Sequence, residues 1–141
     1  MSLHQRPIRG TALVEFAVAW PVALLLALGA VETAVWASEA FAARSAALAG
    51  ARAAAAAGGT SDVAVAVTRR VLSPSLVGVS ASAWCPGESQ ASPVLWVCAR
   101  DLGDAMQVEI GGAVPAIVPL VSQAGLPLHA QVAVQKERFA K

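Results

Sequence analysis

The longest apolar run of the sequence lies close to its start. A short polar and basic stretch comes first, and from Thr11 to Val31 the only charged residue is Glu15. A run of roughly 20 apolar residues can cross a bilayer as a helix. Arg6 and Arg9 precede the run, and basic residues beside a span favour the cytoplasmic side. The pattern predicts one transmembrane helix, with the N-terminus inside the cell and the rest of the chain outside the inner membrane.

Helical character continues beyond this run. Residues 32–57 are rich in alanine, which has the highest helix propensity, and Gly58 and Gly59 end the pattern because glycine favours helix C-terminal caps. A helix over 11–58 would be roughly 70 Å long at about 1.5 Å per residue, so only its first half would span the membrane. Pro21 lies within that half and is expected to kink it.

Shorter patterns follow over residues 59–141. Thr60 and its neighbours can cap a second helix, which the valine spacing extends from about Asp62 to Leu72. Alternating or β-branched stretches predict strands at 76–84, 94–99, 106–110 and 128–135, with a turn at Gly111 and Gly112. An apolar but proline-broken segment precedes the last strand and is too short for a second span. The fold class is therefore α+β: a long N-terminal transmembrane helix and a small extracytoplasmic domain with a short helix and an antiparallel sheet of three or four strands.

Composition supports a membrane protein and argues against several functions. Hydrophobic residues make up 57% and charged residues 13%, whereas soluble domains average about 25% charged. The formal net charge of +1 gives no basic patch for nucleic acid. The only histidines are His4 and His129, and the sequence has no nucleophile–base pair, phosphate loop or metal-ligand spacing. We therefore expect no enzyme activity, no cofactor, no metal site and no nucleic-acid partner.

The two cysteines, Cys85 and Cys98, lie in a region rich in proline and tryptophan. Such a pair can form a disulfide in an oxidising compartment or remain two buried thiols in a reducing one. A bridge across a hairpin is the expected arrangement, with free thiols as the alternative. Because neither cysteine belongs to a CxxC motif, thiol redox catalysis is not expected.

A motif surrounds the start of the apolar run. The stretch RGTALVEFA from Arg9 to Ala17, followed by Pro21, resembles the N-terminal signal of the TadE-like family of tight-adherence pilus proteins. In prepilin-like proteins a membrane aspartic peptidase cuts after the glycine, and a glutamate is the fifth mature residue. The resemblance therefore implies cleavage after Gly10 and a role in assembly for Glu15.

On this interpretation residues 1–10 are a leader and Thr11 is the mature N-terminus, although many major pilins begin with Phe or Met. A carboxylate at the start of an apolar span is costly, so Glu15 needs either a partner, such as a neighbour's N-terminal amine, or access to interfacial water. The resemblance implies a minor pilin or pseudopilin in pilus assembly and adhesion. Its partners would be the prepilin peptidase, other pilin or pseudopilin subunits, the inner-membrane assembly platform and membrane lipid.

Two alternatives remain open at the level of sequence. An ordinary secretory signal could be cut after Ala37, releasing a domain that begins at Ser38, because small residues suit signal peptidase sites. An uncut chain would instead be a single-pass, membrane-anchored binding module outside the cytoplasm.

Overall fold

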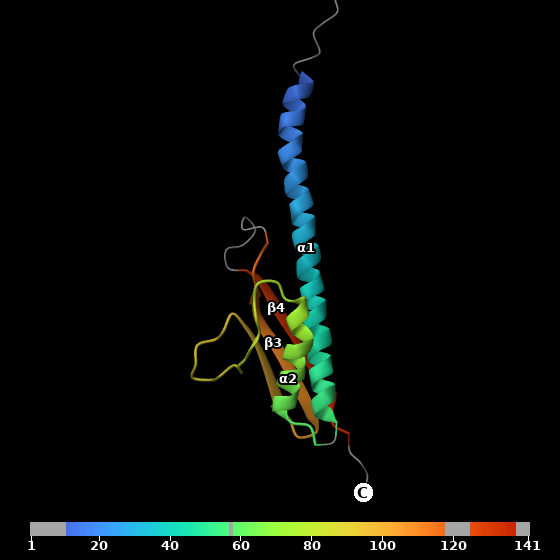
Figure 1. Cartoon of the computed structure of the whole chain (residues 1–141), viewed down its shortest axis with the longest axis vertical. Coiled ribbons are helices and arrows are strands. Elements are labelled where there is room, and N and C mark those ends of the chain that lie inside the picture. Colours follow the sequence, from blue (N-terminus) through green and yellow to red (C-terminus); the bar gives the residue numbers. More distant parts are fainter. Residues whose placement is uncertain (1–10, 57, 118–124, 138–141) are drawn as a thin grey trace, which may run out of the picture.

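The computed structural model describes residues 11–56, 58–117 and 125–137. The elements in these ranges are two α-helices, a short 3-10 helix and four strands (Figure 1). In chain order they are α1 (Thr11–Ala55), α2 (Ser61–Leu72), η1 (Ser73–Ser75), β1 (Ser82–Ala83), β2 (Leu95–Asp101), β3 (Ala105–Val114) and β4 (Leu126–Gln135).

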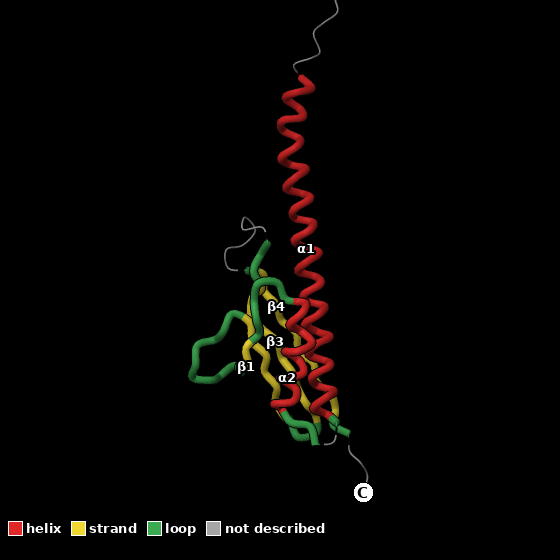
Figure 2. The backbone as a smooth tube through the Cα atoms, in the orientation of Figure 1, coloured by secondary structure: helices red, strands yellow, loops and turns green. Residues whose placement is uncertain are grey.

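The expected α+β fold class is confirmed. The N-terminal half of α1 extends well beyond the other elements, whereas its C-terminal half packs with α2 against one face of the sheet (Figure 2). Helix α1 contacts β3 and β4, and α2 contacts β2. The second half of α1 therefore belongs to the same packed core as the residues that follow it.

Small side chains allow α1 and α2 to approach closely. Ala43, Ala46, Ala47 and Ala51 on α1 are fully buried, as is Ala64 on α2. The start of α2 agrees with the sequence signal, because the Thr60 hydroxyl accepts a hydrogen bond from the Val63 N–H at 3.4 Å.

The closest approach of the two helices is at Gly50. A Cβ added there would overlap Oγ1 of Thr68 and lie 2.6 Å from the carbonyl oxygen of Ala64. The Thr68 hydroxyl itself donates to that carbonyl at 2.7 Å, so the hydroxyl is satisfied although the side chain is fully buried. The absence of a side chain at Gly50 therefore sets the distance between α1 and α2.

The sheet is mixed, in the order β1-β2-β3-β4, and not wholly antiparallel as expected. Strands β2, β3 and β4 form antiparallel pairs, but β1 runs parallel to β2, with Ser82 opposite Trp96. Parallel neighbours need a connection that returns the chain to the starting end of the sheet. The loop from Trp84 to Val94 provides it.

The strand expected over 76–84 is reduced to the two residues of β1. Two residues of this segment bond to the helices instead of the sheet: the Val77 N–H donates to the Glu39 carboxylate at 3.4 Å, and the Ala81 carbonyl accepts from Arg69 Nε at 2.9 Å. Gly78 between them has φ of 72°, outside the β region. Side-chain partners on α1 and α2 therefore replace strand pairing here.

The turn expected at Gly111 and Gly112 is wrong, because both residues lie inside β3. A Cβ on Gly111 would overlap the Trp96 ring, which covers it from the neighbouring strand. Gly112 has φ of 136°, and the next residue, Ala113, donates its N–H to the Val94 carbonyl at 2.8 Å. Both positions need glycine, one for space and one for backbone conformation.

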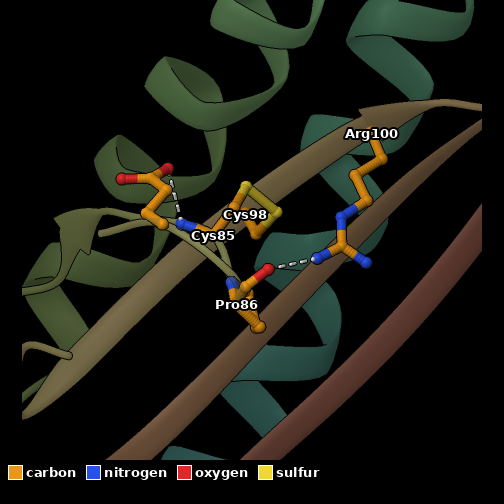
Figure 3. Close-up of a disulfide and its surroundings, with 5 residues drawn as sticks. Cys85, Pro86, Cys98 and Arg100 are labelled. Atoms are coloured by element: carbon orange, nitrogen blue, oxygen red, sulfur yellow. Dashed lines mark hydrogen bonds between the residues drawn. A yellow bond between two sulfur atoms is a disulfide. The ribbon is translucent and has the colours of Figure 1, made fainter. Parts of the chain in front are cut away.

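A disulfide joins Cys85 and Cys98 and closes the loop between β1 and β2 (Figure 3). Within that loop the Cys85 N–H donates to the Glu88 carboxylate at 3.0 Å, and the Arg100 guanidinium donates to the Pro86 carbonyl at 3.1 Å. The bridge therefore connects the segment after β1 with the middle of β2 and does not span an antiparallel hairpin.

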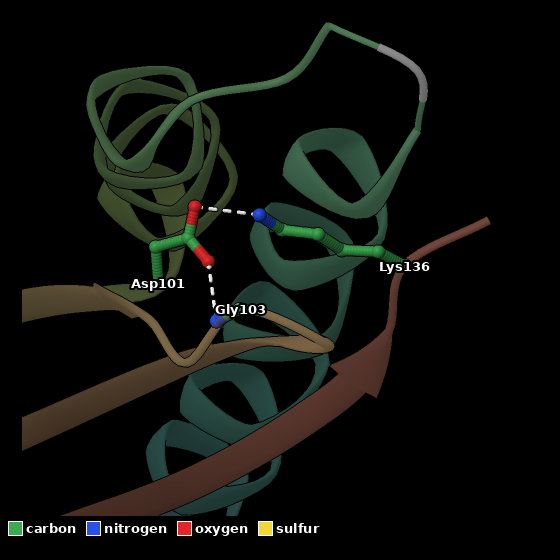
Figure 4. A network of polar contacts seen from close by, with 3 residues as sticks. All are labelled: Asp101, Gly103 and Lys136. Atoms are coloured by element: carbon green, nitrogen blue, oxygen red, sulfur yellow. Dashed lines mark hydrogen bonds and ion pairs between the residues drawn. The ribbon is translucent and has the colours of Figure 1, made fainter. Parts of the chain in front are cut away.

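A second polar network lies at the end of the sheet where β2 is followed by the β2–β3 turn and where β4 ends (Figure 4). The Asp101 carboxylate pairs with Lys136 Nζ and accepts the Gly103 N–H at 2.8 Å. The hydrogen bond from Lys136, followed by that from Gly103, lowers the pKa of Asp101. The Lys136 N–H also donates to the Asp104 carbonyl at 2.9 Å, so the end of β4 is attached to the β2–β3 turn.

Candidate functional site

The N-terminal half of α1 is the most unusual surface of the protein. Its large apolar side chains are exposed around the whole helix; examples are Leu13 at 73%, Phe16 at 66% and Leu26 at 71%. No other described segment covers this half, and α1 is long and apolar enough to cross a membrane. The helix therefore fits a single-pass membrane protein.

Glu15 is the only charged side chain of this apolar half. It lies on one face of the uncovered helix together with Val14, Val18 and Val22. Glu15 has no hydrogen bond or ion pair with any other residue among those the structure describes. The free chain thus leaves the carboxylate without the partner that an apolar environment requires.

The other motif residues have less structural context. Gly10 lies outside the described residues, and Thr11 is the first residue of α1. Pro21 lies within α1, and the helix continues through it. Cleavage at Gly10 and a kink at Pro21 remain predictions.

Two carboxylates that sequence reasoning did not single out anchor α1 to the rest of the fold. Glu32 is 5% exposed and accepts the Ile117 N–H at 3.1 and 3.0 Å through its two oxygens. Glu39, two turns later on the same side of the helix, is 3% exposed and accepts the Val77 N–H. Backbone donors thereby offset part of the cost of burying two charged groups.

A tryptophan and a backbone hydrogen bond hold β4 against α1. Trp36 Nε1–H donates to the Pro127 carbonyl at 3.0 Å near the start of β4. Just beyond the other end of the strand, the Glu137 N–H donates to the Ala55 carbonyl at 3.2 Å. The helix that carries the apolar half is therefore fixed along the whole length of the edge strand.

The environment of Glu39 predicts a pH-dependent stability. Burial raises the pKa of Glu39, the Val77 N–H partly opposes this, and the charge of Glu32 raises it further. A carboxyl group whose pKa is higher in the folded state favours folding when protonated, below its unfolded pKa of about 4.3. That contribution is lost as the pH rises through the folded pKa.

Glu39→Gln is therefore expected to raise the thermal unfolding temperature by a few degrees at pH 7 and to leave it unchanged near pH 4. Circular dichroism of the full chain in detergent at both pH values measures this. Glu109→Gln, which removes a half-buried carboxylate from β3, is the matched control. A lower unfolding temperature for Glu39→Gln at pH 7 would contradict the expectation.

Within the described ranges, no group of three or more His, Cys, Asp or Glu residues could hold a metal ion. The exposed apolar helix and its anchors can bind and position other helices, which is the property that the site offers.

Comparison with known proteins agrees with this geometry. The model of the family described as TadE-like protein matches residues 10–52, which contain Glu15, Glu32 and Glu39 and end within the C-terminal half of α1. No curated protein and no solved structure matches the chain. The family is a structural one associated with tight-adherence pili. The match agrees with the resemblance carried by the N-terminal motif: over residues 10–52 this chain is similar to the TadE-like proteins.

Proposed function

We propose that this protein is a minor pilin or pseudopilin of a tight-adherence, type IV-like pilus system, acting in pilus assembly and surface adhesion. The observation that carries the proposal is the uncovered apolar half of α1 with Glu15 near its start, within the segment that matches the TadE-like family. Such a helix is stable in lipid and also among other apolar helices. A subunit that leaves the membrane to join an assembly must be stable in each of these two environments.

The proposed mechanism is mechanical and not chemical. The prepilin peptidase cuts after Gly10 and frees an amine at Thr11. The helix then moves laterally from the inner membrane into the assembly, guided by the assembly platform, and the Glu15 carboxylate accepts the amine of a neighbouring subunit. The packed domain stays outside the cytoplasmic membrane.

The continuity of α1 supports retention of the helix over release of a secreted domain. Cleavage after Ala37 would remove Glu32 and Trp36, which hold the Ile117 backbone and the start of β4. The released domain would lose both anchors and would begin within a buried helix. The alternative, an anchored binding module outside the cytoplasm, would form no filament and would be distinguished by a leader that is never removed.

Gly10→Trp is expected to block processing, because a peptidase acting at the membrane surface needs an unhindered, extended backbone at the cut. The test compares intact mass and N-terminal residue for the wild-type chain and the variant, both extracted from native membranes. We expect a start at Thr11 for the wild type and an uncut leader for Gly10→Trp.

Other N-termini would contradict the proposal in distinct ways. A mature-sized Gly10→Trp product would refute the cleavage site. A wild-type start at Ser38 would indicate a secreted domain, and an uncut wild-type chain would indicate a plain membrane anchor. Gly29→Ala, which adds a methyl group at a position with no neighbour within 4 Å, should be processed like the wild type and serves as the control.

A further inference from the structure

The end of the packed domain that faces the uncovered half of α1 carries exposed apolar side chains and no charge. Strand β3 ends and β4 begins on this side of the domain (Figure 1). Val77, Val94 and Ile117 are 56%, 67% and 51% exposed. The segments that form this end contain no charged residue; they are residues 76–79, 93–95, 112–117 and 125–127. We refer to Val77, Val94, Pro115 and Ile117 as the apolar end of the domain.

The segments of the apolar end are packed side by side, so their side chains form one surface. A Cβ on Gly78 would lie 3.7 Å from Cγ of Pro115, and the Ala113 N–H donates to the Val94 carbonyl at 2.8 Å. An apolar groove of about 310 Å³ lies between Gly78, Val94 and Pro115. Ile117 follows Pro115 by two residues and extends this surface toward the uncovered half of α1.

The opposite end of the domain has the reverse character. Asp101 pairs with Lys136 there, the Lys136 N–H bonds to the carbonyl of Asp104, and Glu137 is the next residue along the chain. Contiguous exposed apolar surface in a protein marks contact with another protein or with a membrane. A domain with charge at one end and exposed apolar side chains at the other fits a boundary between water and lipid.

Two hydrogen bonds fix the height of the apolar end along α1. The Ile117 N–H donates to Glu32 and the Val77 N–H to Glu39, so the two bonds lie roughly 10 Å apart along the helix. Residues 11–31 span roughly 30 Å, which is the thickness of the hydrocarbon core of a bilayer. Ile117 therefore lies where hydrocarbon meets headgroups. Val77 lies just beyond the headgroup layer, which is about 5–8 Å thick.

Trp36 agrees with this placement of the membrane boundary. It lies about 7 Å beyond the end of the apolar run, within the headgroup layer, where tryptophan is enriched in membrane proteins. Its Nε1–H donates to the Pro127 carbonyl at 3.0 Å. The start of β4 is therefore held at the headgroup level by a contact that does not involve Glu32.

We propose that the packed domain docks on the lipid surface through its apolar end, with the Ile117 side chain inserted at the hydrocarbon boundary and Glu32 holding it there. Lipid is the partner because this end begins at the level on α1 where the apolar run stops. The inference rests on a membrane-spanning α1 and does not depend on the pilus function proposed above. Attachment at two places, along α1 and at Ile117, restricts the tilt of the domain relative to the bilayer.

The test measures the depth of a nitroxide spin label in the full chain, reconstituted in vesicles of phosphatidylethanolamine and phosphatidylglycerol. The label is attached to Ile117→Cys, since the native cysteines are joined in a disulfide and do not react. Power saturation compares collisions with oxygen, which concentrates in lipid, and with a water-soluble nickel chelate present on both sides of the bilayer. The ratio of oxygen to nickel collisions at position 117 should be several times the ratio at Leu102→Cys.

The control sites separate the possible outcomes. Leu102 is 57% exposed next to the β2–β3 turn, far from the apolar end, and Val77→Cys should give a ratio between those of positions 102 and 117. A ratio at 117 equal to that at 102 would overturn the proposal, and so would low collision rates with both reagents, which would mean that protein covers the site. Leu25→Cys, within the apolar half of α1, should give the highest ratio; a label in water there would mean that α1 does not span the bilayer.

The role of Glu32 as a positioning residue is tested with the same label at position 117. Glu32→Ala should shift the ratio toward the value at Leu102, because the Ile117 N–H loses its acceptor. Glu32→Gln keeps an acceptor oxygen and should retain most of the lipid contact. Glu109→Ala, which removes a half-buried carboxylate from β3, is the matched control. An unchanged ratio in Glu32→Ala would refute the role of Glu32, and unchanged circular dichroism excludes unfolding as the cause of any shift.

Discussion

Glu15→Val is expected to leave membrane insertion and leader cleavage intact and to impair incorporation into the pilus. Valine is more easily accommodated in lipid than a carboxylate, so insertion of α1 is not impaired. The variant nevertheless loses the only charge of the apolar half, and with it the group that can bind a neighbour's N-terminal amine. Leaving that amine unpaired among apolar helices costs several kcal/mol, which corresponds to a decrease in assembly of at least roughly tenfold.

The measurement is the amount of mature protein in sheared pilus fractions relative to the amount in the membrane. Glu15→Asp, which keeps the charge on a shorter side chain, should assemble measurably better than Glu15→Gln, which keeps the size and loses the charge. Normal piliation in Glu15→Val would eliminate the role proposed for the carboxylate. A mature-sized membrane form of each variant confirms that only assembly was affected.

Gly50→Ala is expected to destabilise the packed domain strongly, although alanine is the better helix former. The gain in helix propensity is about 1 kcal/mol. Against it, the new methyl group would overlap Oγ1 of Thr68 and approach the Ala64 carbonyl to 2.6 Å. Overpacking a closely fitted interface costs roughly 1–3 kcal/mol or more, and the rigid backbone of α2 cannot move aside as a flexible side chain could. The net effect should be a clear fall in unfolding temperature.

Gly29→Ala is the matched control for this prediction because it makes the same change in the same helix. A Cβ there has no neighbour within 4 Å, so only the propensity gain remains and stability should stay equal or rise. The double variant with Thr68→Ala should recover part of the loss, since it removes the hydroxyl but not the Ala64 carbonyl. Equal unfolding temperatures for Gly50→Ala and Gly29→Ala in detergent would show that α1 and α2 are not as close as the structure indicates.

Local signals predicted the helices well. The apolar and alanine-rich run set the extent of α1, the glycine pair marked its end, and Thr60 marked the start of α2. These features are local because helical hydrogen bonds join residues four apart. Strands β2, β3 and β4 also followed from alternation, although their ends were placed too short.

Features that depend on distant contacts could not be predicted in this way. The segment around Val77 alternates like a strand but bonds to Glu39 on α1. Gly111 lies inside a strand, where the Trp96 ring on the neighbouring strand leaves no room for a side chain. The roles of Glu32 and Glu39 were missed for the same reason, since their partners come from far along the chain. Their spacing of two helical turns, in a helix with few charged residues, is the signal that could have revealed them.

The attachment of β4 to α1 at both ends has a consequence for a protein under tension. The Trp36–Pro127 and Ala55–Glu137 hydrogen bonds lie at opposite ends of the strand, which runs beside the helix. A force that pulls the domain along the axis of α1 therefore loads both contacts, and the packed side chains between them, in shear and at the same time. Peeling them apart one after another would require a force across the helix, which a filament stretched along its length does not supply.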